Sequence, residues 1–145
     1  MNKNTILERN INCSNVYGRN LLQEAIVSCR NTIASDLVNK GIDINHQDKM
    51  GWTPLHFCAQ YNNITIAELL LRKGAKVNFI DCYGNNPLWY AVFNANDDYR
   101  LVKLLIRYGA DALSKNNAMR SPLDFARQIE DTEMINILTD KKSKF

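Results

Sequence analysis

Apolar and polar positions alternate in blocks along the chain, and the clearest block covers residues 48–81. One apolar segment opens with Pro54, the pair Asn62-Asn63 interrupts it, and a second apolar segment runs up to Gly74. Proline fits the first turn of a helix, where its missing N–H is not needed, and glycine fits the left-handed position that ends a helix. The block therefore predicts a helix, a turn, a second helix and a loop.

The same block recurs at a fixed spacing. Gly18, Gly51 and Gly84 are 33 residues apart, and Met119 occupies the next equivalent place after 35 residues. A tetrad begins two residues after each of these positions, as Asn20-Leu21-Leu22-Gln23, Thr53-Pro54-Leu55-His56, Asn86-Pro87-Leu88-Trp89 and Ser121-Pro122-Leu123-Asp124. Such repetition in phase is typical of stacked repeats, in which each unit buries its apolar face against its neighbours.

The period and the Thr-Pro-Leu-His tetrad resemble the ankyrin repeat, over about nine tenths of the chain. The resemblance implies an all-α fold, an ankyrin-repeat α-solenoid of helix-turn-helix units joined by β-turn or hairpin loops. It also implies that Thr53 and His56 hydrogen-bond and tie the turn to the next repeat, which makes His56 structural rather than catalytic. In this family the loop tips and the exposed side of the first helix form a concave binding face.

The register divides a single domain into unequal repeats. We expect an N-terminal half-repeat cap at 1–14, repeats at 15–47, 48–80 and 81–114, a C-terminal capping repeat at 115–142 and a tail at 143–145. Cys29 falls in the inter-helix turn where the next repeat has Asn62, and a left-handed turn suits Asn but strains Cys. The third repeat carries two extra residues within 94–99, which we interpret as a longer turn that leaves both apolar stripes intact.

Composition adds limits to this picture. The chain has 145 residues, 46% of them hydrophobic, and shows neither a membrane-spanning apolar run nor the apolar core of a signal peptide, so we expect a soluble cytoplasmic protein. Its formal charge of +3 falls to zero when Lys141, Lys142 and Lys144 are set aside, which does not favour nucleic-acid binding. The four cysteines form no CxxC pair, so we expect reduced thiols rather than disulfides or zinc.

Motifs that carry catalysis are absent from the sequence, including GxGxxG, GxxxxGK[ST], HExxH and GxSxG. The acidic pairs Asp97-Asp98 and Glu130-Asp131 fall in inter-helix turns, where carboxylates cap helices. Cys58 stands where the ankyrin family prefers alanine and is interpreted as a core residue. No histidine is aligned beside Cys82 to activate it. We therefore expect no enzyme activity, no metal and no cofactor.

The expected partner is a protein, because large side chains gather at positions that the ankyrin family exposes. Aromatic residues anchor interfaces because they bury much area for little lost entropy. For some of them, Phe57 and Phe93 among them, packing between repeats is the alternative. The candidate partner-binding residues are Tyr17, Met50, Trp52, Phe57, Tyr61, Phe79, Tyr83, Asn85, Tyr90, Phe93 and Arg120.

The segment GNNPLWYAVFN at 84–94, in a short chain, is similar to small stand-alone bacterial ankyrin proteins that act as toxin immunity partners. This resemblance implies an immunity protein, monomeric when free, that neutralises a bacterial toxin by covering its working surface. A secreted host-directed effector or a cytoplasmic scaffolding adaptor is an alternative from another class. An enzyme with an unrecognised site is a third. No membrane or small-molecule partner is expected.

Overall fold

The computed structural model describes residue 11 and residues 13–140 of the chain. Within these residues the regular structure is α-helical, and strand-like pairing is limited to one isolated bridge between Ser14 and Asn20. The helices are α2 Leu21–Val27, α3 Asn31–Asn39, α4 Pro54–Tyr61, α5 Ile64–Arg72, α6 Pro87–Phe93, α7 Arg100–Arg107, α8 Pro122–Gln128 and α9 Thr132–Thr139. This arrangement confirms the predicted all-α repeat solenoid.

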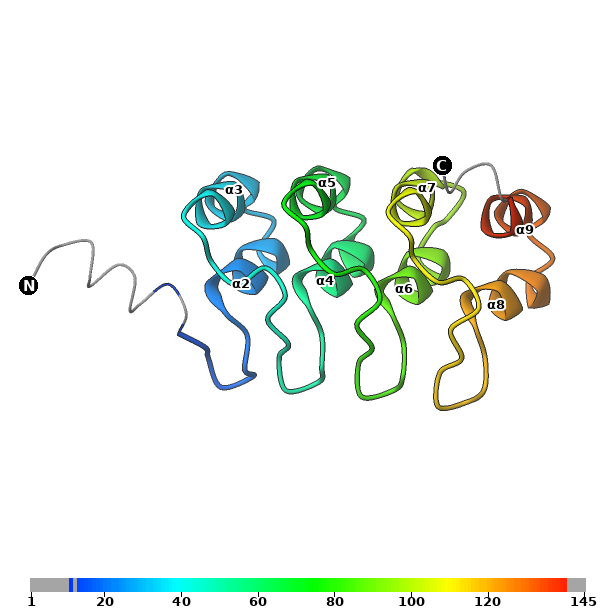
Figure 1. Cartoon of the computed structure of the whole chain (residues 1–145), viewed down its shortest axis with the longest axis horizontal. Coiled ribbons are helices and arrows are strands. Elements are labelled where there is room, and N and C mark those ends of the chain that lie inside the picture. The colour runs from blue at the N-terminus through cyan, green and yellow to red at the C-terminus, as the bar shows by residue number, and fades with distance from the viewer. Residues whose placement is uncertain (1–10, 12, 141–145) are drawn as a thin grey trace, which may run out of the picture.

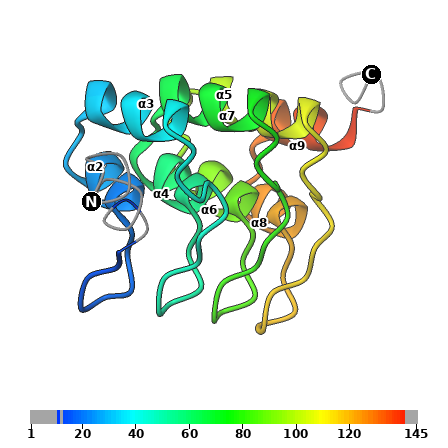
Figure 2. The same ribbon diagram turned by 60° about the vertical axis from the view of Figure 1, so that its left-hand side comes forward.

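The helices stand in two parallel rows (Figure 1). The first helices α2, α4, α6 and α8 contact one another in that order, and the second helices α3, α5, α7 and α9 do the same. The loops that join successive helix pairs lie side by side, below the row of first helices in the view of Figure 2. The molecule is therefore an elongated stack of helix pairs with a row of loops along one edge.

Each first helix begins at the tetrad. The side chains of Asn20, Thr53, Asn86 and Ser121 accept a hydrogen bond from the backbone N–H three residues on, which caps the helix. Proline occupies the first helical turn in α4, α6 and α8. The tetrad therefore fixes where each repeat starts its helix.

The turn within a helix pair needs a left-handed residue. Asn62 adopts this conformation with φ of 52°, and Cys29 adopts it with φ of 56° in the first repeat. Cys29 thus adopts the left-handed conformation expected of this turn, and the strain that the conformation would impose on it stays a prediction. In the third repeat the two extra residues lengthen this turn, in which Asn96 and Asp97 both have positive φ.

A glycine with positive φ follows the second helices α3, α5 and α7, as Gly74 illustrates. Its φ is 87°, and a Cβ added to it would meet no atom within 4 Å. The position therefore requires glycine for its backbone conformation rather than for space.

The core runs along the stack between the two rows. Leu55, Leu70, Leu88 and Leu105 are all fully buried, and Cys58 is buried among them, as expected for a small core residue. Burial raises the pKa of the Cys58 thiol. No helix in the described part of the chain combines the length and apolar character that crossing a membrane requires.

Two predicted regions fall wholly or largely outside the described residues. The half-repeat cap at 1–14 is described only at residues 11, 13 and 14, and the tail at 143–145 is not described.

Candidate protein-binding face

We use the term loop face for the surface formed by residues 14–20, 47–53, 80–86 and 115–121 with the adjoining first helices. One side chain stabilises each loop by accepting hydrogen bonds from the backbone N–H groups two and four residues on. These acceptors are Asn15, Asp48, Asp81 and Asn116. The geometry of every loop is thus fixed by one short polar side chain.

Neighbouring loops are also joined to one another through the backbone. The N–H of Lys49 donates to the carbonyl of Tyr17 at 3.1 Å, and the N–H of Cys82 donates to the carbonyl of Met50 at 2.9 Å. Asn117 donates to Tyr83 in the same way, at 2.9 Å. This ladder holds the loop tips in register, so that the loop face is preformed.

His56 links the second repeat to the third. Its Nδ1 accepts the backbone N–H of Thr53 at 3.0 Å, so Nε2 carries the proton and donates to the carbonyl of Asn85 at 2.9 Å. The ring is fully buried, and burial lowers the pKa of His56 although Asn85, Asp81 and Asp48 act in the opposite direction. These contacts confirm a structural role for Thr53 and His56.

Gln23 occupies the equivalent place in the first repeat. Its Oε1 accepts the backbone N–H of Asn20 at 3.0 Å, and its Nε2 donates to the carbonyls of His46 at 2.7 Å and Trp52 at 2.8 Å. A glutamine therefore replaces the histidine of the tetrad as a neutral link that does not titrate.

Asp81 organises the aromatic side chains at the centre of the loop face. Its Oδ2 accepts the indole N–H of Trp52 at 3.0 Å and the hydroxyl of Tyr90. The Trp52 ring lies 4.9 Å from the ring of Phe57 and 4.7 Å from that of Tyr90. Asp81 itself is buried, and its carboxylate is a shared acceptor that holds the side chains of both Trp52 and Tyr90 in place.

An open pocket of about 240 Å³ lies beside this cluster. Of the predicted residues, it brings together Met50, Trp52, Phe57, Tyr61 and Tyr83, and the other residues that line it are Arg19, Asp48 and Gln60. We call it the loop-face pocket. The prediction missed Arg19, although it stands at the same repeat position as Trp52 and that equivalence was readable in the sequence.

Two arginines at this repeat position stack on aromatic rings. The guanidinium carbon of Arg19 lies 5.0 Å from the ring centre of Tyr17 and 5.1 Å from that of Phe57. Arg19 also pairs with Glu24 at 3.4 Å. Arg120 lies 5.9 Å from the ring centres of both Trp89 and Phe125. The loop face thus combines aromatic area with fixed cations.

The predicted residues differ in accessibility. Exposed side chains are Tyr17, Met50, Tyr61, Tyr83 and Phe93, and partly buried ones are Trp52, Phe79, Tyr90 and Arg120.

Phe57 and Asn85 are corrected by the structure. Phe57 is only 3% exposed because Trp52 and Arg19 lie against its ring. Asn85 is 8% exposed, and its side chain donates to Tyr90 and accepts from Asn116. Both side chains therefore pack beneath the exposed residues of the loop face.

A second aromatic group lies further along the stack. The ring of Phe125 is 5.3 Å from that of Phe93 and 5.7 Å from that of Trp89. Phe93 of α6 therefore packs against Phe125 of the fourth repeat, so the aromatic candidate residues form two groups rather than one.

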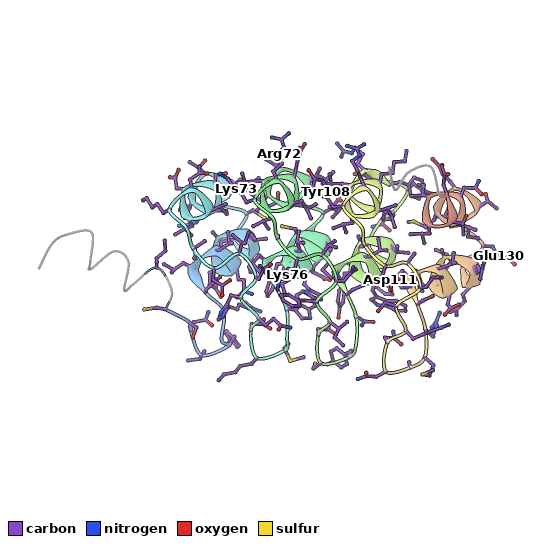
Figure 3. All side chains as sticks on the ribbon, in the orientation of Figure 1. Arg72, Lys73, Lys76, Tyr108, Asp111 and Glu130 are labelled. Carbon is purple, nitrogen blue, oxygen red and sulfur yellow. The ribbon has the colours of Figure 1, made fainter. Side chains whose placement is uncertain are left out.

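The opposite side of the molecule has a different character. Arg72 projects from α5 on the side away from the loops, and Lys73 follows it at the end of the same helix (Figure 3). Tyr108, at the end of α7, is exposed on this side and contributes a tyrosine outside the loop face.

Acidic side chains in the turns serve the helices. Asp131 caps α9 by accepting a hydrogen bond from the backbone N–H of Met134 at 3.0 Å. Asp98 accepts hydrogen bonds from the side chains of Arg100 and Asn62. Arg100, followed by Asn62, lowers the pKa of Asp98. Across residue 11 and residues 13–140, no three His, Cys, Asp or Glu side chains are grouped so that they could hold a metal ion.

A family model described as ankyrin repeats, in three copies, matches residues 25–116. The ankyrin repeat protein FPV244 of fowlpox virus is 33% identical over 131 residues, which are 90% of this chain and 18% of the viral protein. Alpha-latrotoxin-Lg1a of the spider Latrodectus geometricus is 29% identical over 139 residues, which are 94% of this chain and 10% of the spider protein. A second fowlpox protein, FPV230, is 43% identical over 60 residues, which are 41% of this chain and 32% of that protein.

The chain thus spans from 10% to 32% of the length of these relatives. They come from a poxvirus and a spider, and none of their names describes an immunity protein. The expected bacterial stand-alone type gains no support from them.

Proposed function

The chain belongs to the ankyrin-repeat family, and on that premise we propose that it binds a folded protein partner through the loop face, centred on the loop-face pocket. Ankyrin repeats indicate a protein–protein interaction module, and the proposal concerns where and how this module binds. Binding occurs without chemical turnover of the partner. The partner covers the exposed tips of the first three loops and inserts side chains into the pocket.

The observation that carries this proposal is the set of large side chains held around a preformed pocket. Tyr61 and Tyr83 line it and are exposed, while the buried Asp81 fixes Trp52 beside them. Rigid aromatic anchors lose little entropy when a partner docks, which favours them at interface centres. Met50 adds an adaptable apolar contact at the same place.

The immunity role is one form of this binding, in which the partner is a toxin whose working surface is covered. The relatives named above do not favour it, so the proposal remains with protein binding. A host-directed effector or an adaptor would use the same face, and the captured partner distinguishes these roles.

The test uses the full chain as bait in extracts of its native host. The variant Tyr61→Ala with Tyr83→Ala removes two exposed anchors, and Tyr108→Ala on the opposite side is the matched control. Each anchor is worth about 2 kcal/mol at an interface centre, so the double variant should bind the captured protein on the order of a thousandfold more weakly. Tyr108→Ala should bind it like the parent. Equal binding by all three proteins, with unchanged helical spectra, would contradict the proposal.

A further inference from the structure

Arg19 stands in the loop-face pocket against two aromatic rings. Its guanidinium carbon lies 5.0 Å from the ring centre of Tyr17 and 5.1 Å from that of Phe57, and its side chain is 28% exposed. The attraction between a cation and a ring acts on the charge of the guanidinium and uses none of its N–H donors. The two rings therefore hold Arg19 in place and leave these donors for other acceptors.

Few acceptors are available to these donors. In the described part of the chain the guanidinium makes one hydrogen bond, from Nη1 to Oε1 of Glu24, and at 3.4 Å this bond is long. The same oxygen accepts a much closer hydrogen bond from Asn15, at 2.6 Å. The Nε of Arg19 is buried without a hydrogen bond, and the carboxylate of Asp48 is 3.9 Å from it. Donors that lack acceptors favour a ligand that supplies them.

The charges of the loops also favour an acidic ligand. The loops carry four cations, all exposed or partly exposed, which are Arg19, Lys49, Lys115 and Arg120. Their carboxylates are turned inward, since the side chain of Asp48 is 4% exposed and Asp81 is buried. Among the residues that the structure describes, Lys49 and Arg120 form no ion pair, and the other two cations pair with an acidic residue of the adjoining first helix. The loop face should therefore attract a partner that is acidic where it docks.

The walls of the loop-face pocket indicate what kind of acidic group fits. Trp52, Tyr61 and Tyr83 line the pocket of about 240 Å³ together with Arg19. The indole N–H of Trp52 is already donated to Asp81, so Trp52 offers ring surface rather than a free donor. Ring surface suits the methylene groups of a side chain, and Arg19 suits an acceptor at its end. Aspartate and glutamate side chains combine both features, because a short aliphatic stem carries their carboxylate.

We infer that the partner inserts a carboxylate side chain, of aspartate or glutamate, into the loop-face pocket, where it accepts hydrogen bonds from the guanidinium of Arg19. This inference rests on the proposed function, because it names the group that the partner inserts. The planar fork of an arginine matches a carboxylate. A phosphate would bring about two negative charges towards Glu24 and Asp48, which lie 3.4 Å and 3.9 Å from the same guanidinium. The single charge of a carboxylate is repelled less.

The first test measures the binding kinetics of the captured partner with three variants of the full chain. Arg19→Gln should raise the dissociation rate by on the order of tenfold or more, because the inserted carboxylate loses its charged donor. Arg19→Lys should give a smaller increase, since it keeps the charge but not the fork. Lys49→Gln, at an exposed cation of the neighbouring loop, is the matched control and should mainly lower the association rate. Equal dissociation rates for Arg19→Gln and Lys49→Gln would overturn the inference.

The second test changes the partner and keeps the parent chain, so it does not depend on how well Arg19→Gln folds. Each acidic side chain of the captured partner is replaced in turn by its amide. One replacement should raise the dissociation rate from the parent chain and have little further effect on Arg19→Gln, because the two groups share one contact. The inference would be wrong if no replacement behaved in this way. Loss of binding after phosphatase treatment of the partner would also contradict it, since a phosphate would then be the ligand.

The tyrosine variant of the proposed function separates the two possible failures. If Tyr61→Ala with Tyr83→Ala weakens binding and Arg19→Gln binds like the parent, the loop face remains the binding site and the carboxylate inference is wrong. If both variants bind like the parent, the proposed function is wrong as well.

Discussion

At the scale of the residue, the molecule relies on buried polar side chains that serve its loops. Asp81 accepts hydrogen bonds from two backbone N–H groups, from Trp52 and from Tyr90, and it is buried. Burial, followed by the bond to Asp81, raises the pKa of the Tyr90 hydroxyl. A buried acceptor with several donors is costly to remove, because each abandoned donor loses its partner. The arrangement of the loop face therefore depends on residues that a partner does not touch.

His56 should make stability depend on pH. Burial lowers its folded-state pKa below the ordinary value of 6.5, so the unfolded chain takes up the proton first as pH falls. The contribution of neutral His56 to the free energy of unfolding should have its full value above pH 6.5. It should decrease as pH falls from 6.5 towards the lowered pKa.

The control is His56→Gln, because Gln23 already makes the equivalent bonds in the first repeat. Urea unfolding of both proteins should be measured between pH 5 and pH 7.5. The free energy of unfolding should depend less on pH in the variant, because the variant lacks the one histidine that causes this dependence. Identical profiles would show that His56 does not contribute this dependence.

At the scale of the element, the sequence identifies the ends of helices reliably because local chemistry sets them. The caps at Thr53 and Asn86, and the left-handed residue at Asn62, follow from rules that involve only neighbouring positions. The burial of Phe57 was not predictable in this way. Its ring is covered by Arg19, 38 positions earlier in the sequence, and by Trp52, so its exposure depends on tertiary packing.

The turn of the first repeat offers an element-scale prediction. Cys29 has φ of 56°, a conformation that costs most side chains roughly 1 to 2 kcal/mol and that asparagine tolerates better. Cys29→Asn should therefore raise the free energy of unfolding by about 0.5 to 1 kcal/mol, measured by urea denaturation. Cys82→Asn, at another exposed cysteine, is the control and should have no such effect. A lower unfolding midpoint for Cys29→Asn would mean that the turn is not strained.

At the scale of the whole molecule, the 33-residue register carries most of what the sequence could predict. It defined the stack of helix pairs and brought Met50, Trp52 and Tyr83 towards one face, where the structure places them around one pocket. The register could not separate the aromatic residues into two groups, because Phe93 is turned towards Phe125 of the next repeat. It also says nothing of the partner, whose surface is not encoded in the spacing of this chain.

The central claim is that the loop face is where a protein partner binds, and amide hydrogen exchange of the bound complex tests it most directly. With the captured partner added in excess, exchange should slow in residues 47–53 and 80–86 and in α4. Exchange in α5 and α7 on the opposite side should remain as in the free protein. Slowing confined to α5 and α7, with the loops unchanged, would contradict the account.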